Sequence, residues 1–333
     1  MTKISFPGIG IGEFGLPEVL LSFGENFKIY WSAVFMAIAV IIATILAFLK
    51  LKKLSIKADD MIDLTLFTVI FSVIGARLYY AIGSPQNING FFGIFAIWNG
   101  GLEFYGALIA GAITIFVFSR IKKLPVLKIF DSLSLPIIIA QFIVAIGNFF
   151  NTDAIGSQIY DGDALYFIRM GISPHNFDIT GDVAFVHPTF LYEAIWLLIG
   201  TGVIALFSRK KKFDGQSALI YAAWYGLGRT LIEGFELYAP KLGVFRLTQV
   251  VGFFSFIACT LLLIFNLAKA YRKQKDSEEY IPAYKKISRP SSLFEKNDDD
   301  DDYTPSFNFS ANDNDGEVEK SEDNYAENGD TEE

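Results

Sequence analysis

Seven apolar runs, each close to the length that crosses a lipid bilayer, constrain what this chain can fold into. They cover residues 29–49, 61–82, 102–119, 133–150, 189–207, 217–235 and 247–267. A membrane-spanning helix needs about 20 mostly apolar residues. The overall composition agrees, since 52% of the residues are hydrophobic. We therefore predict an all-α polytopic membrane protein with seven transmembrane helices.

The loops between these runs predict how the helices are oriented. The loops after the first, third, fifth and seventh runs each carry four Lys or Arg residues, whereas the other loops carry two at most. Lys and Arg collect in the cytoplasmic loops of membrane proteins. The pattern therefore predicts an N-terminus outside the cell and a C-terminus in the cytoplasm.

The two ends of the chain differ in composition from the predicted membrane domain, residues 29–275. Residues 1–28 are interrupted by Pro and Gly, and we expect a short external segment lying on the membrane surface. Residues 276–333 hold 19 acidic and five basic residues, which predicts a disordered, acidic cytoplasmic tail. The loop 151–188 is predicted to be external, with a short hairpin within residues 176–185.

Cysteine and histidine are scarce in this chain. The single cysteine, Cys259, excludes an intramolecular disulfide and argues against a thiolate metal site. Two histidines are too few for a dedicated histidine cluster. We expect no metal, no cofactor and no nucleic-acid partner.

Polar residues in and after the fourth run form the first candidate site. Gln141 lies inside the run, and Asn148, Asn151 and Asp153 follow it, ahead of Gly156. Polar side chains at membrane depth are costly unless they face a bundle interior or a wet cavity. This stretch is therefore predicted to form the wall and floor of a site.

Charged residues inside other runs form a second candidate group. Arg229 and Glu233 are spaced i, i+4, which places them on one helix face and predicts an ion pair, with Tyr225 on the same face. Arg77 and Glu193 also lie at membrane depth and need partners. Intramembrane ions usually mark function, although a buried pair that only fixes helix packing is the alternative.

A glycine-rich segment, residues 99–111, allows two interpretations. Gly100 and Gly101 lead into a helix that also carries Glu103 and Tyr105. Small residues favour close packing between membrane helices, whereas free N–H groups at a helix start suit an anion. Because an arginine fork binds phosphate well, we expect a cavity toward the outer leaflet in which an arginine holds a lipid phosphate.

His187, at the outer boundary of the fifth run, is open to two interpretations as well. It is either a base or a hydrogen-bonded residue at the membrane interface, and a lone histidine favours the second.

Seven motifs resemble, in chain order, the bacterial prolipoprotein diacylglyceryl transferases. They are ADDMIDLTLF, GARLYYAI, AIWNGGLEFYGALIAG, GNFFNTDAIG, HPTFLYEA, WYGLGRTLIEG and RLTQ. Tyr105 and the YGLGR motif are similar to those of Gram-positive members. The resemblance implies a multi-pass enzyme of the bacterial plasma membrane. It would transfer a diacylglyceryl group from phosphatidylglycerol to the lipobox cysteine thiol of a preprolipoprotein, the first step of lipoprotein maturation.

The resemblance also implies roles for individual residues. Arg229 would bind the phosphate region beside Tyr225, and Tyr105 stands where other members have a proposed histidine base. The remaining residues implied to bind substrate are Asn148, Asn151, Gly156, Asp153, Gly100, Gly101, Arg77, Glu193 and Arg246.

Two arginines of the family pattern are replaced in this chain. Ala145 stands at the phosphate-binding arginine of the signature, and Glu236 stands at the arginine after the sixth run. An active transferase would need Arg77 or Arg246 to supply the missing charge. The alternative is a diverged paralogue that binds lipid or lipoprotein with weak or no activity. A small-solute transporter is less favoured, because the sequence has no internal repeat.

Overall fold

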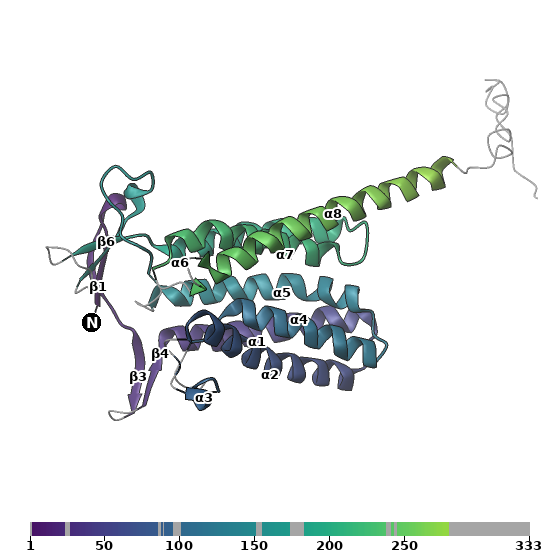
Figure 1. The fold of residues 1–333 in the computed structure, drawn as a ribbon, viewed down its shortest axis with the longest axis horizontal. Coiled ribbons are helices and arrows are strands. Elements are labelled where there is room, and N and C mark those ends of the chain that lie inside the picture. Colours follow the sequence, from purple (N-terminus) through teal and green to yellow (C-terminus); the bar gives the residue numbers. More distant parts are fainter. Residues whose placement is uncertain are drawn as a thin grey trace, which may run out of the picture. The chain divides into compact units, whose positions relative to one another are not determined.

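Seven long helices dominate the computed structural model, which describes residues 2–23, 27–85, 88, 90–95, 101–150, 155–173, 183–237, 241–242 and 245–279 (Figure 1). The helices are α1 (Trp31–Leu51), α2 (Ala58–Gly83), α4 (Phe104–Ile121), α5 (Val126–Gly147), α6 (Thr189–Arg209), α7 (Gln216–Ile232) and α8 (Leu247–Glu279). One short helix, α3 (Gly90–Gly93), precedes α4. Short 3-10 turns are η1 (Pro7–Ile9), η2 (Lys52–Leu54), η5 (Asn148–Phe150), η6 (Tyr166–Ile168) and η7 (Glu233–Phe235).

Six of the predicted spans are helices long and apolar enough to cross a membrane. These six comprise α1, α2, α4, α5, α6 and α8. The exception among the described helices is α7, which has 17 residues and carries Arg229 near its end. The chain is therefore a mostly helical, polytopic membrane protein, and its seventh span remains a prediction. Helix α8 extends to Glu279, beyond the predicted end of its span.

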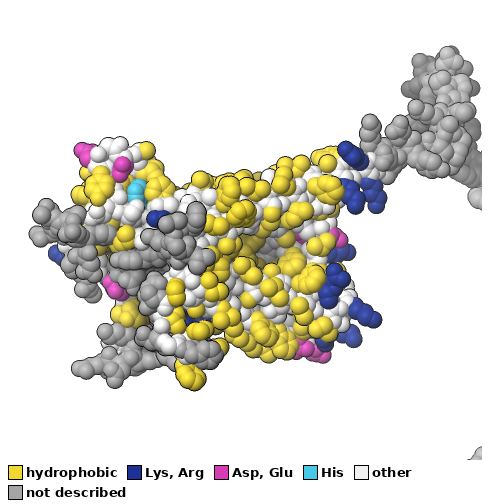
Figure 2. Space-filling model, viewed as in Figure 1, with side chains coloured by type: hydrophobic (Ala, Val, Ile, Leu, Met, Phe, Trp, Pro, Cys, Tyr) yellow, Lys and Arg dark blue, Asp and Glu magenta, His cyan; other side chains and the backbone are white. Residues whose placement is uncertain are grey.

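Side chains on the surface agree with a membrane location. Figure 2 shows hydrophobic side chains over most of the helical surface, with Lys and Arg side chains gathered at one end of the helices. Many large apolar residues on α1 and α2 are exposed, including Ile41, Leu49, Ile62 and Leu66. Such a surface suits lipid rather than water. The acidic tail predicted at 276–333 lies almost entirely outside the described residues.

Glycines bring two pairs of helices into close contact. A Cβ atom added to Gly75 on α2 would lie 2.6 Å from the carbonyl oxygen of Gly106 on α4. A Cβ atom at Gly226 on α7 would lie 2.6 Å from the carbonyl oxygen of Gly252 on α8. Backbones approach this closely only where no side chain intervenes. The packing interpretation of the glycine-rich segment is thus confirmed for Gly106.

Polar contacts fix the position of α7. The Asp131 carboxylate on α5 accepts hydrogen bonds from the backbone N–H groups of Gly215, at 2.7 Å, and Ala218, at 3.1 Å, and so caps the start of α7. Trp196 on α6 and Trp224 on α7 each donate an indole N–H to the other's carbonyl oxygen, at 3.0 Å. Helix α7 is therefore fixed by hydrogen bonds to α5 and to α6.

A β-sheet accounts for much of the N-terminal segment. Strands β1 (Thr2–Phe6), β2 (Ile11–Leu16), β5 (Met170–Ser173) and β6 (Ala184–Val186) form one antiparallel sheet in the order β2-β1-β5-β6. The other described strands form two hairpins. Strand β3 (Val19–Phe23) pairs with β4 (Phe27–Tyr30), and β7 (Lys241–Leu242) pairs with β8 (Phe245–Arg246). The all-α prediction is therefore wrong for this part of the molecule.

The position of residues 1–28 at the membrane surface stays a prediction, but their strands have a partner that the sequence did not indicate. Strand β1 pairs with β5, whose residues lie far along the chain, and Ile4 is opposite Ile172. Both side chains are buried in a small core with Met170 and Val186. Partners so distant leave no local signature in the sequence. The hairpin predicted within 176–185 lies mostly outside the described residues, although β5 and β6 do pair.

Candidate functional site

A cavity of about 1840 Å³ lies among the helices, lined by residues of α1, α2, α4, α5, α6, α7 and α8. It exceeds the roughly 300–1,000 Å³ of pockets for drug-sized ligands. Most of its lining is apolar. Five polar lining residues gather where α4 and α6 begin and where α5 and α7 end, namely Glu103, Asn148, Glu193, Arg229 and Glu236. The cavity thus combines room for acyl chains with one polar end.

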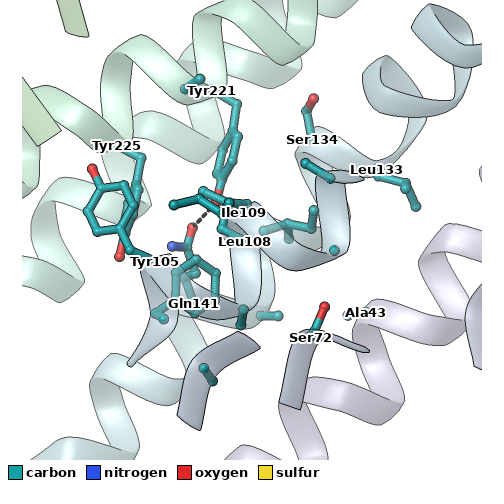
Figure 3. A pocket seen from close by; sticks show the side chains of 18 of the residues that line it. Ala43, Ser72, Tyr105, Leu108, Ile109, Leu133, Ser134, Gln141, Tyr221 and Tyr225 are labelled. Atoms are coloured by element: carbon teal, nitrogen blue, oxygen red, sulfur yellow. Dashed lines mark hydrogen bonds between the residues drawn. The ribbon is translucent and has the colours of Figure 1, made fainter. Parts of the chain in front are cut away.

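Tyrosines and an amide line the middle of the cavity (Figure 3). Tyr221 donates its hydroxyl to Gln141 Oε1 at 3.1 Å, which confirms that Gln141 faces the bundle interior. The rings of Tyr105 and Tyr225 lie 5.2 Å apart between their centroids. The Tyr105 side chain is only 3% exposed, yet its hydroxyl has no hydrogen-bond partner among the described residues. Buried hydroxyls normally have a partner, so this group is available to a ligand.

Arg229 stands at the centre of a carboxylate cluster. Its Nη2 lies 2.6 Å from Glu233 Oε2 and its Nη1 lies 2.9 Å from Glu236 Oε1. Glu193 Oε1 lies 3.6 Å from Nη1. The predicted i, i+4 pair is confirmed, and Glu193 has the partner it requires. The Arg229 Nε has no acceptor among the described residues, which leaves one N–H for a ligand.

Arg77 binds backbone carbonyl oxygens and is not among the described residues that line the cavity. Its guanidinium donates to the carbonyl oxygens of Gly93, at 2.7 Å, and of Ile94 and Gly101, each at 3.2 Å. Arg246 donates from Nη1 to the carbonyl oxygen of Glu233. Neither arginine is among the described residues that line the cavity. Arg246 therefore lies next to Glu233, which pairs with Arg229, whereas Arg77 binds other segments.

Ala145 and Asn148 both line the cavity, at the end of α5. Ala145 is 1% exposed and packs in the same apolar cluster as Tyr105 and Tyr225. Among the described lining residues, Arg229 is the only Lys or Arg. The end of α5 thus presents an amide to the cavity and no cation.

Gly156 has a structural role at the edge of the site. Its N–H donates to the His187 carbonyl oxygen at 3.0 Å, and it forms a bridge with Glu236. A Cβ atom at this position would lie 2.5 Å from the His187 carbonyl oxygen and 3.0 Å from that of Phe235. Because only glycine fits between these backbones, the residue ties the start of α6 to the segment that carries Glu236.

Gly101 and His187 also serve to position neighbouring groups. Gly101 has a φ of +72°, which favours glycine, and its carbonyl oxygen accepts the Arg77 bond. His187 Nδ1 lies 3.1 Å from the Tyr192 hydroxyl, and its ring packs on Phe235 at 4.7 Å. Burial lowers the pKa of His187, although Asp163 acts in the opposite direction. His187 therefore has the hydrogen-bond partner that its second interpretation expected, and its place at the membrane interface stays a prediction.

Three predicted site residues, Gly100, Asn151 and Asp153, lie outside the described residues. Two carboxylates to which the sequence analysis assigned no substrate-binding role, Glu103 and Glu236, line the cavity. Glu236 follows η7 in an extended backbone conformation, so helical spacing from Arg229 gave no signal for their contact. Within the described part of the chain, no group of three His, Cys, Asp or Glu residues is arranged to hold a metal ion.

Comparison with known proteins identifies the family. The sequence matches the prolipoprotein diacylglyceryl transferase family over residues 18–265. The chain belongs to this family. The match covers all the long helices except the end of α8, so the resemblance carried by the motifs is confirmed.

Three relatives of this chain come from different bacteria. The protein from Listeria innocua is 34% identical over 265 residues, covering 78% of this chain and 94% of the relative. A Streptococcus suis protein is 32% identical over 77% of this chain and 92% of its own length. A protein from Ligilactobacillus salivarius is 33% identical over 72% of this chain and 90% of its own length. All three are named phosphatidylglycerol–prolipoprotein diacylglyceryl transferase.

Proposed function

We propose that this chain transfers a diacylglyceryl group from phosphatidylglycerol to the lipobox cysteine thiol of a preprolipoprotein. Family membership and the names of the relatives support this function. The observation that carries it is the position of Arg229, a buried guanidinium at the polar end of a cavity large enough for a lipid. Arginine suits phosphate because its planar fork bonds two oxygens.

The reaction is a displacement at carbon. The cysteine sulfur attacks the glyceryl carbon next to the phosphate, a carbon–sulfur bond forms, and the carbon–oxygen bond breaks. Glycerol phosphate leaves with the electron pair, and the thiol proton is released to solvent. Stabilising the charge that develops on a leaving group is usually the largest catalytic contribution. Arg229 supplies that stabilisation through Nε and through whichever Nη the carboxylates release.

Other residues of the site then have defined roles. The unpaired Tyr105 hydroxyl donates to a phosphate oxygen, and the Tyr225 ring packs beside it. Asn148 offers an amide at the end of α5. Arg77 positions the Gly101 segment, since it binds that carbonyl oxygen. Binding of headgroup and thiol in one cavity supplies the remaining rate enhancement through proximity.

The membrane arrangement follows from the loops and the helices. Helix α7 and η7 together run from Gln216 to Phe235, which approaches the about 20 residues that a span needs. The proposed arrangement counts α7 as a span and has seven spans, with the N-terminus outside and the C-terminus, on the side of the basic loops, in the cytoplasm. The polar end of the cavity then opens toward the outer leaflet of the bacterial plasma membrane. Lys and Arg side chains gather at the opposite helix ends (Figure 2), as the cytoplasmic side requires.

A specific observation favours a second candidate, a diverged paralogue that binds lipid or lipoprotein with little activity. Arg229 is already paired with carboxylates, and Ala145 contributes no cation. A headgroup phosphate therefore has to compete with Glu236 for the guanidinium. The two candidates differ in turnover rather than in what they bind.

Complementation separates these candidates. Bacteria depleted of their own transferase receive this chain, Arg229→Ala or Arg120→Ala, with membrane levels of each protein measured. The active transferase predicts growth with the unchanged chain and with Arg120→Ala, a control at the far end of α4, and no growth with Arg229→Ala. No growth with the unchanged chain at normal membrane levels would favour the paralogue.

A further inference from the structure

The cavity extends from its polar end far along the helices. On α4 its lining runs from Glu103, the residue before the helix, to Ile115. At a rise of 1.5 Å per residue, this stretch is about 18 Å long. The hydrocarbon core of a bilayer is about 30 Å thick, so the chains of one leaflet reach about 15 Å. This part of the cavity is therefore about as deep as one leaflet of acyl chains.

Small side chains line this part of the cavity on three helices. On each helix they recur every four residues, a spacing that keeps them on one face. They are Ala39, Ala43 and Ala47 of α1, Thr68, Ser72 and Ala76 of α2, and Ala107 and Gly111 of α4. Figure 3 labels two of them, Ala43 and Ser72, where they line the cavity. Such small side chains leave the space between the helices unfilled, and that space belongs to the cavity.

A large apolar side chain ends each of these faces. Leu51, Leu64 and Ile115 stand one helical turn beyond the last small residue of α1, α2 and α4, respectively. All three line the cavity, yet they are only 1%, 2% and 4% exposed. They also belong to one buried apolar cluster. The space among α1, α2 and α4 therefore ends at these three side chains.

Contacts between helices fix the position of this closed end. Phe130 and Leu133 of α5 pack against the same apolar cluster. Lys122, which follows α4, forms an ion pair with Asp60 near the start of α2, at 2.8 Å. This pair joins α2 and α4 at the ends that lie away from Glu103. The three large side chains are thus carried by helices that are packed together beyond the cavity.

We propose that one acyl chain of the donor lipid lies among α1, α2 and α4, and that Leu51, Leu64 and Ile115 limit its length. The inference rests on the proposed transferase function, in which the headgroup phosphate binds Arg229 at the polar end. A chain about as long as one leaflet fills the space down to the three side chains. A longer chain has to bend or displace them, and overpacking of this kind is unfavourable.

Competition among donor lipids tests the inference, because the modified peptide keeps both acyl chains and its mass reports their length. The purified full-length chain is incubated with a lipobox peptide and micelles of several phosphatidylglycerols in equal amounts. Their paired acyl chains range from shorter to longer than one leaflet, about 15 Å. We expect chains longer than a leaflet to be transferred about tenfold less, since extra methylenes in a hydrophobic pocket discriminate on this scale. Products in the proportions of the supplied lipids overturn the inference while supporting the transferase function.

Two substitutions at Ile115 should move the limit in opposite directions. Ile115→Ala deepens the space and should raise the share of long-chain product, whereas Ile115→Phe should shift the product toward shorter chains. Ile113→Ala is the matched control on α4, because Ile113 is 58% exposed and lies outside the lining, and it should leave the product unchanged. Identical product from Ile115→Ala and Ile113→Ala contradicts the assignment.

A second pair of variants replaces the first if the Ile115 variants do not fold, as judged by their melting temperature. Leu64→Ala also deepens the closed end, from α2. Leu66→Ala is its control, because Leu66 is 54% exposed and does not line the cavity. A larger share of long-chain product from Leu64→Ala alone supports the length limit. Identical product from the two variants overturns it.

Lipid retention distinguishes failure of the function from failure of the inference. If no lipid reacts, the transferase function fails, and native mass spectrometry of the chain mixed with the same phosphatidylglycerols decides the length question. Retention of chains no longer than one leaflet, shifted to longer chains by Ile115→Ala, supports the proposed limit. Equal retention of all chain lengths overturns it.

Discussion

Arg229 Nη1 and Glu236 Oε1 lie 2.9 Å apart at the polar end of the cavity. The only guanidinium among the described lining residues is therefore bound to a carboxylate before any substrate arrives. A phosphate that binds here uses the remaining Nε or displaces Glu236. This pairing links the geometry of the site to the rate of reaction.

Removing Arg229 should destabilise the protein, because it leaves Glu233 buried and unpaired. Glu233 has a side chain with 0% exposure, and loss of one partner from a buried ion pair costs about 3–5 kcal/mol. We expect Arg229→Ala to lower the melting temperature in detergent. The double variant Arg229→Ala, Glu233→Gln should recover most of that loss. A melting temperature that the single variant leaves unchanged would show that the pair contributes little.

Neutralising Glu236 should improve the use of phosphatidylglycerol. Glu236→Gln removes the competing charge from Arg229 but retains a side chain of the same size. A charge-assisted bond contributes roughly 1.5–3 kcal/mol, so the apparent KM for phosphatidylglycerol should fall about tenfold or more. Steady-state transfer to a lipobox peptide measures it. A higher KM would mean that Glu236 aids binding instead of opposing it.

Adding a guanidinium at position 145 should also raise transfer from phosphatidylglycerol. Ala145 lines the cavity, so the side chain of Ala145→Arg can reach the headgroup region. Ala145→Leu is the control, since it adds volume without charge. We expect higher activity for the arginine variant alone. If the unchanged chain already complements fully and Ala145→Arg alters nothing, the account of the phosphate site is wrong.

Replacing Gly156 should disturb the site without touching the cavity. In Gly156→Ala the new Cβ would meet the His187 carbonyl oxygen at 2.5 Å, and such overpacking costs about 1–3 kcal/mol. The segment that holds Glu236 should shift, so activity and melting temperature should both fall. Gly202→Ala on α6 is the matched control, because no atom lies within 4 Å of its added Cβ. Equal behaviour of the two variants would refute a positioning role for Gly156.

Local sequence predicted the helices well and the sheet poorly. Apolar runs of spanning length became α1, α2 and their counterparts, because a helix satisfies its hydrogen bonds within one segment. The Arg229–Glu233 pair followed from the same local geometry. Strand β1, by contrast, is stabilised by β5, and no pattern within residues 1–28 reveals a partner so distant. Long-range pairing was therefore the main feature that the sequence did not predict.

The site was predicted in part. Tyr105, Tyr225, Arg229, Glu193 and Asn148 line one cavity, as the candidate residues implied. Arg77 is not among the described residues that line the cavity, and its guanidinium donates to carbonyl oxygens of the segments before α4, so its role in substrate binding stays a prediction. Backbone acceptors carry no side-chain signature, so a sequence pattern cannot distinguish a guanidinium that holds a loop from one that binds phosphate.

The most direct test of the account compares peptide modification by the unchanged chain and by the double variant Arg229→Ala, Glu233→Gln. Each purified protein is incubated with donor lipid and a lipobox peptide, and the peptide mass is measured. We predict that the unchanged chain adds one diacylglyceryl group to the cysteine and that the folded double variant adds none. A double variant that modifies the peptide at the unchanged rate would contradict the central role of Arg229.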